Sequence, residues 1–178
     1  IHITQSLADD HANHFRSALQ QLDYYAPDSL GLLSVGDNVD GSNNLTAVVK
    51  GQYSNFMALL NDSAFSKKFY PTIGNHDLFL VNLKGHDFVA ELFTENFNRP
   101  LDYDVWLNDS LHVIVLGDSG GGDNYATITE EQVKWLDEKM ADRYGEEGVV
   151  TLLSLHQPLY NTVSGSFPGQ NWNGVDED

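Results

Sequence analysis

The sequence predicts an α/β fold, and two observations lead to this prediction. The spacing of hydrophobic residues alternates between a helical period and short apolar runs typical of strands, without a long linker or an internal repeat. In addition, three apolar runs end in polar residues that can carry chemistry, namely Gly36-Asp37, Gly74-Asn75 and His156. In an open α/β sheet, residues at the carboxyl ends of the strands form the ligand site.

Helices and strands can be assigned in order along the first part of the chain. Residues Leu7–Tyr25 carry an apolar stripe at helical spacing, with Ser6 as the expected N-cap. Leu30–Val35 is a short apolar run that predicts a buried parallel strand. A second helix is expected over Thr46–Leu60.

The same alternation continues in the middle of the chain. Lys68–Ile73 predicts a strand that Pro71 interrupts, and His86–Phe97 predicts a helix. The two runs Tyr103–Leu107 and Leu111–Leu116, which a short polar turn separates, predict a hairpin.

The last elements are a capped helix and a strand. Thr129 and Gln132 form a capping box for a helix that we expect to end at Gly145. Val149–Leu155 predicts the final strand, and the Gly- and Asn-rich segment after Asn161 predicts a loop. This helix carries the apolar residues Val133, Leu136 and Met140. The side chains expected to pack on the sheet are Trp135 and Leu136 from this helix and Trp106 from the hairpin.

Composition limits the possible functions. The chain has 178 residues, which suit a single domain over 1–178, and its 9 Lys and Arg against 26 Asp and Glu give a net charge of −17. Binding to duplex nucleic acid is therefore not expected, and no membrane span is expected either. Because cysteine is absent, any metal must be held by His, Asp, Glu or Asn. The acidity and the lack of cysteine favour an extracytoplasmic or secreted protein.

Three short motifs combine to suggest a metal site. They are Gly36-Asp37-Asn38-Val39-Asp40, Gly74-Asn75-His76-Asp77 and Leu155-His156-Gln157-Pro158, and each stands at the end of a predicted strand. Taken singly, such residues are more often turns, caps or structural histidines. Together they form a set of oxygen and imidazole donors that suits hard or borderline metal ions.

These motifs resemble those of the calcineurin-like metallophosphoesterases, which run Asp-x-His, Gly-Asp-x-x-Asp, Gly-Asn-His-Asp/Glu, a single His, and Gly-His-x-His. Ile1-His2-Ile3 resembles the first motif cut just after its Asp, and Gly-His-x-His is not found in this sequence. The resemblance implies a four-layer α-β-β-α sandwich. We expect this chain to form such a sandwich, truncated at both ends.

The resemblance also implies roles for individual residues. Asp37 would bridge two divalent or trivalent ions of Mn, Fe or Zn, with His2 on the first ion and Asn75 and His156 on the second. A hydroxide on the metals would attack phosphorus, and His76 would assist the leaving group. Asp40 or Asp77 would orient the His76 ring.

The implied substrate is a small phosphorylated molecule, and the sequence leaves open whether the activity is that of a phosphodiesterase or of a phosphatase. Tyr160, Asn161 and Trp172 follow the last motif, and we expect them to contact the substrate. Because His2 and Asp37 alone make a weak site for the first metal, a catalytically inactive, phosphoesterase-like binding domain is the alternative.

Two other motif matches fail on their context. Ser119 lies in Gly117-Asp118-Ser119-Gly120-Gly121, which fits a serine-hydrolase elbow, but the glycines that follow disfavour the helix that such an elbow needs. Asp37–Gly41 partly fits a calcium loop, yet Gly36 and Ala47 then occupy positions that require acidic ligands.

Overall fold

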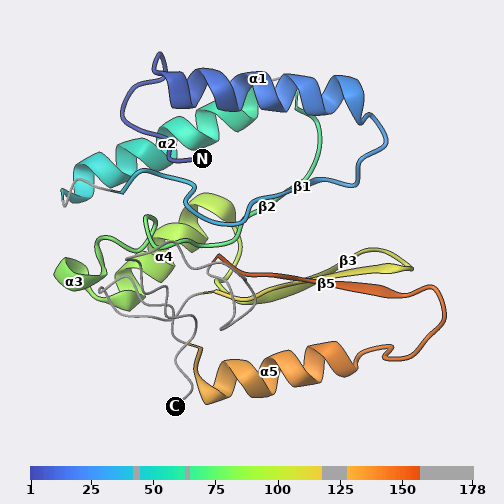
Figure 1. Cartoon of the computed structure of the whole chain (residues 1–178). Helices are drawn as coiled ribbons and strands as arrows, with labels where there is room; N and C mark the ends of the chain where they lie inside the picture. Colours follow the sequence, from blue (N-terminus) through green and yellow to red (C-terminus); the bar gives the residue numbers. More distant parts are fainter. Residues whose placement is uncertain (42–44, 63–64, 118–127, 157–178) are drawn as a thin grey trace, which may run out of the picture.

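The computed structural model describes residues 1–41, 45–62, 65–117 and 128–156 (Figure 1). Its helices and strands alternate as an α/β fold requires. In chain order they are α1 Asp10–Tyr25, β1 Leu32–Leu33, α2 Thr46–Asp62, β2 Phe69–Tyr70, α3 Val81–Lys84, α4 His86–Phe97, β3 Tyr103–Asn108, β4 Leu111–Val115, α5 Glu130–Ala141 and β5 Val150–Ser154. Within these residues, no helix has the length and apolar character needed to cross a membrane.

The described strands form two sheets. In the first sheet β1 pairs in parallel with β2, and in the second β4 lies between antiparallel β3 and parallel β5. Figure 1 shows α1 and α2 on the outer side of the first sheet and α5 on the outer side of the second. The predicted hairpin and last strand are therefore confirmed.

Strands β1 and β2 are only two residues long, shorter than predicted. Their main chains nevertheless stay together past the strand ends, because Ser34 N–H donates to Tyr70 O at 2.9 Å and Thr72 N–H donates to Ser34 O at 3.2 Å. Pro71 lies between these contacts and has no N–H to donate, so the regular ladder stops there. The two chain segments still arrive side by side at the polar motifs.

Two apolar clusters fix the segments that carry these motifs. Ile3 packs with α1 and α2, whereas Val39 and Ile73 pack with α2 and α4. All three side chains are fully buried. Burying such a side chain contributes about 1.5–3 kcal/mol, so each motif is anchored by an adjacent apolar residue.

The N-terminus of α1 differs from the prediction. The N-cap is Asp9 and not Ser6, because the Asp9 carboxylate accepts the N–H of Ala12 at 2.9 Å and also the hydroxyl of Thr4. The helix therefore begins at Asp10, three residues after the predicted start at Leu7. By contrast, α4 has the predicted bounds at both ends.

Helix α5 has the predicted capping box but packs differently. Thr129 and Gln132 exchange the two expected hydrogen bonds, at 3.2 and 3.0 Å. However, the apolar residues Val133 and Met140 are 54% and 45% exposed, whereas Trp135 and Leu136, which were expected to pack on the sheet, are half-buried. The buried side chain is that of Gln132, whose Nε2 donates to Gly117 O at 2.8 Å and to the Asp102 carboxylate. The helix ends at Ala141 and does not reach Gly145.

Candidate metal centre

Two glycines allow the loops after β1 and β2 to meet. A Cβ atom on Gly74 would lie 2.2 Å from the Asp37 nitrogen, and one on Gly36 would lie 2.5 Å from His156 Nδ1. Gly36 also has a φ of +96°, which L side chains rarely adopt. The glycine that precedes Asp37 and the one that precedes Asn75 therefore bring the two motifs into direct contact.

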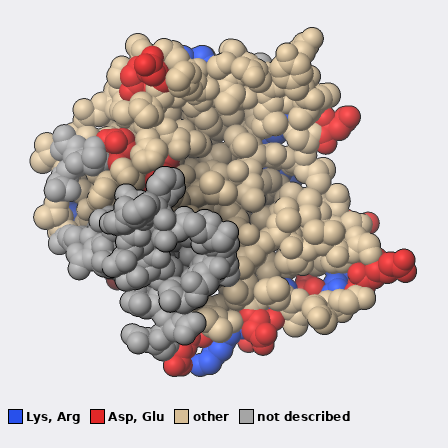
Figure 2. Space-filling view, in the orientation of Figure 1, with Lys and Arg blue, Asp and Glu red and all other residues tan. Residues whose placement is uncertain are grey.

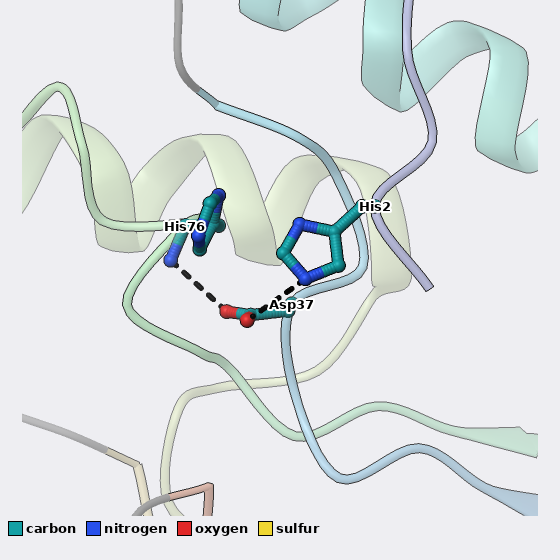
Figure 3. A group of neighbouring side chains, drawn as sticks. All are labelled: His2, Asp37 and His76. Atoms are coloured by element: carbon teal, nitrogen blue, oxygen red, sulfur yellow. Dashed lines mark hydrogen bonds and ion pairs between the residues drawn. The ribbon is translucent and has the colours of Figure 1, made fainter. Parts of the chain in front are cut away.

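The first residues of the chain lie beside the Asp37 loop. Ile3 and Val39 form a parallel bridge, and His2 N–H donates to Asp37 O at 2.9 Å. This pairing places the His2 imidazole next to the Asp37 carboxylate, with Nε2 and Oδ2 3.3 Å apart (Figure 3).

His2, Asp37 and His76 form a half-buried cluster in which one ligand atom of each lies within 4.8 Å of the others. The main-chain N–H of His76 donates to Asp37 Oδ1 at 3.0 Å, and the rings of His2 and His76 meet edge to face with centroids 4.2 Å apart. Burial lowers the pKa of His2, and the neighbouring His76 lowers it further although Asp37 opposes the shift. A lowered pKa favours the neutral imidazole, which is the form that binds metals.

His156 completes a second group on the other oxygen of Asp37. Its Nδ1 lies 2.7 Å from Val35 O, while its Nε2 lies 2.9 Å from Asn75 Oδ1 and 3.3 Å from Asp37 Oδ1. A carbonyl oxygen can only accept, so Nδ1 carries the hydrogen and Nε2 of the neutral ring bears a lone pair. The lone pairs of His156 Nε2, Asn75 Oδ1 and Asp37 Oδ1 then face one another, and such a set of donors fits a cation.

The ring of His76 is held by the main chain of Asp40. His76 Nδ1 donates to Asp40 O at 2.6 Å, which leaves Nε2 as the ring atom that can exchange a proton with a ligand. The sequence predicted that a carboxylate, from Asp40 or Asp77, would orient this ring. The Asp40 carbonyl holds the ring at Nδ1, and a contact from either carboxylate stays a prediction.

Asp77 lies in the interior and is 1% exposed. Its hydrogen bonds tie the two loops together and come from the main-chain N–H groups of Gly74 (2.8 Å), Asn38 (3.2 Å) and Val39 (3.2 Å), and from the side chains of Asn38 and Tyr53. Burial raises its pKa to about 6 although these N–H groups oppose the shift. These contacts make Asp77 a support for the two loops, and its predicted role in orienting the His76 ring stays a prediction.

Asn38 and Tyr53 are site-supporting residues that the sequence analysis missed. Asn38 is fully buried; it accepts the Ser34 hydroxyl at 2.6 Å and donates to Thr72 O at 2.8 Å. Asn38 lies inside the Gly-Asp-x-x-Asp motif, and this was the one sign in the sequence that it belongs to the site. Nothing in the motif shows that the side chain at this position is directed into the interior. The predicted substrate contacts Tyr160, Asn161 and Trp172, and also Ser119, lie outside the described residues.

The sequence was compared with those of known protein families. A sequence profile described as calcineurin-like phosphoesterase matches residues 1–176. The chain belongs to the calcineurin-like phosphoesterase family. No curated protein matches the sequence. The general chemistry of calcineurin-like phosphoesterases is metal-dependent hydrolysis of phosphoric esters, and the His and Asp cluster around Asp37 is a possible site for the divalent metals that they bind.

Proposed function

We propose that this chain hydrolyses a small phosphodiester or phosphomonoester at the cluster around Asp37. The observation that carries the proposal is the convergence of lone-pair atoms from His156, Asn75 and Asp37. In a protein, such an arrangement is stable when a cation or a proton lies between the atoms.

Asp37 would hold the metal ions together with His2, His156 and Asn75. Oδ2 faces His2, whereas Oδ1 faces His156 and Asn75, so each oxygen has its own imidazole partner. Nitrogen and oxygen donors of this kind suit Mn, Fe or Zn. When bound, these metals would supply Lewis acidity toward the phosphoryl oxygens and activate water. Asn75 binds through a neutral amide and thus leaves more positive charge for the anionic substrate.

His76 would hold the proton that the leaving oxygen needs. Because Nδ1 is held by the Asp40 carbonyl, the transferable proton sits on Nε2, and the ring keeps one orientation during the reaction. Asp77 would act indirectly, by fixing the loops that carry Asp37 and Asn75.

We also propose a four-layer α-β-β-α sandwich that forms a single domain over residues 1–178. Support comes from the arrangement in Figure 1, where helices lie outside each of the two sheets. Further support comes from the family match, which extends over nearly the whole chain.

Turnover of bis-p-nitrophenyl phosphate and of p-nitrophenyl phosphate by the manganese-loaded chain tests this function. We expect release of p-nitrophenol from at least one of the two esters, and loss of the activity when the metal is removed with a chelator. Tight manganese binding without turnover of either ester would instead support the alternative of an inactive binding domain.

A further inference from the structure

Helix α1 places a fourth imidazole, that of His11, beside the candidate metal centre, which already holds those of His2, His76 and His156. The rings of His2 and His11 have centroids 6.5 Å apart, whereas those of His2 and His76 are 4.2 Å apart. The His2 ring thus has the rings of His76 and His11 as neighbours. His11 lies in none of the three motifs.

The position of His11 is fixed although its side chain is exposed. Asp9 caps the helix directly before it, and Asn55 Nδ2 donates to Thr4 O at 3.0 Å, which holds the loop that leads into α1. The neighbouring Ala12 is fully buried. The His11 ring makes no hydrogen bond or ion pair with the residues that the structure describes, so a ligand can accept a hydrogen bond from its ring N–H.

Three cationic side chains in the described part of the chain are engaged away from the centre. Lys139 pairs with Asp104 at 2.8 Å, Arg143 pairs with Glu146 at 2.8 Å, and Lys50 lies over the ring of Phe88. On the face shown in Figure 2, Lys and Arg side chains are few, and Asp and Glu side chains lie mainly toward the edge. The chain has a net charge of −17, which repels anions. A hydrogen-bond donor such as an imidazole N–H close to the metal centre would therefore favour the binding of an anionic ligand.

We propose that His11 is a substrate-binding residue, which donates a hydrogen bond to an oxygen of the phosphoryl group held beside His2. The inference rests on the proposed function, because it takes the ligand of the centre to be a phosphoryl group. The centroid separation of 6.5 Å is comparable with two N–H···O contacts of about 2.9 Å each that meet on one phosphoryl oxygen. Hydrogen bonds to a charged acceptor are stronger than those between neutral groups.

The test compares phosphate binding by the manganese-loaded wild type, His11→Ala and His11→Gln, with His14→Ala as the matched control. His14 is also exposed and lies one turn further along α1. By calorimetry with inorganic phosphate, we expect His11→Ala to weaken binding about tenfold. The control should match wild type, and His11→Gln, which keeps a donor, should recover part of the loss. The manganese content should be equal in all four proteins.

Two results would overturn the inference. One is wild-type phosphate affinity in His11→Ala, and the other is a loss of manganese from that variant, which would make His11 a support for His2. These results differ from a failure of the proposed function. In that case the wild type would bind manganese and phosphate but hydrolyse neither nitrophenyl ester.

Discussion

His156 donates its Nδ1–H to the main-chain carbonyl of Val35 at 2.7 Å, and this bond joins the end of β5 to the end of β1. It links the two sheets at the candidate metal centre. It also fixes the tautomer of His156, so that Nε2 presents a lone pair toward Asn75 and Asp37.

Replacing His156 with Ala should therefore remove one of two metal ions. Loss of an outer hydrogen-bond partner of a metal ligand already costs about 10–100-fold in affinity or activity, so loss of the ligand itself should reduce turnover by more than about 100-fold. Metal analysis after dialysis measures the bound manganese, and His14→Ala again serves as the control. Unchanged manganese content in His156→Ala would contradict the assignment of His156 as a ligand.

Replacing His76 with Ala should slow the reaction without removing metal. A general acid contributes about 10²–10⁴-fold, and its contribution is larger for poor leaving groups. The rates for a series of substituted phenyl esters should thus depend more steeply on the acidity of the phenol in His76→Ala than in wild type. If the two slopes are equal, His76 does not protonate the leaving oxygen.

Replacing Gly74 with Ala should destabilise the loops around Asp37. The added Cβ would lie 2.2 Å from the Asp37 nitrogen, and overpacking of this kind typically costs about 1–3 kcal/mol. The control is Gly51→Ala within α2, where a Cβ meets no atom within 4 Å and should stabilise the helix by about 1 kcal/mol. Urea denaturation measures both changes, and a loss of stability in Gly51→Ala or a gain in Gly74→Ala would contradict this steric account.

The stability of the metal-free chain should depend on pH through Asp77. Its pKa is about 6 in the folded state, against an ordinary value of 3.8, because burial disfavours the charged carboxylate. Between these values the folded state binds a proton that the unfolded state releases. The free energy of unfolding should therefore fall as pH rises from about 4 to about 6, by an amount on the order of 3 kcal/mol, and then level off.

Asp77→Asn tests this dependence, because the amide does not titrate. Urea denaturation of both metal-free proteins at several pH values between 4 and 7 should give a flatter profile for the variant. Identical slopes in the two proteins would mean that other carboxylates cause the pH dependence.

Much of the fold was predictable because local patterns and tertiary packing agree there. The bounds of α4 and the capping box at Thr129 follow from spacing and cap chemistry alone. The packing of α5 was not predictable, because its inward side chain is Gln132 and not Val133 or Met140. That orientation depends on Asp102 and Gly117, which lie far away in the sequence.

The candidate metal centre was likewise predictable in part: its residues were, but some of their contacts were not. His2, Asp37, Asn75, His76 and His156 were selected from short motifs, and the structure brings them together. The contacts of Asp77 were not foreseen, because a carboxylate that follows His76 directly in the sequence can point either toward the ring or into the interior. Here the interior orientation is favoured, since five donors converge on this carboxylate.

Asp37 has the central place in this account, because both imidazole groups meet on its carboxylate. The most direct test measures the bound manganese and the hydrolysis of bis-p-nitrophenyl phosphate and p-nitrophenyl phosphate together, in wild type and in Asp37→Asn. We predict that the wild type binds about two equivalents and hydrolyses at least one of the esters, and that Asp37→Asn loses both properties. Hydrolysis by Asp37→Asn at the wild-type rate, or a wild type that binds no metal, would contradict the account.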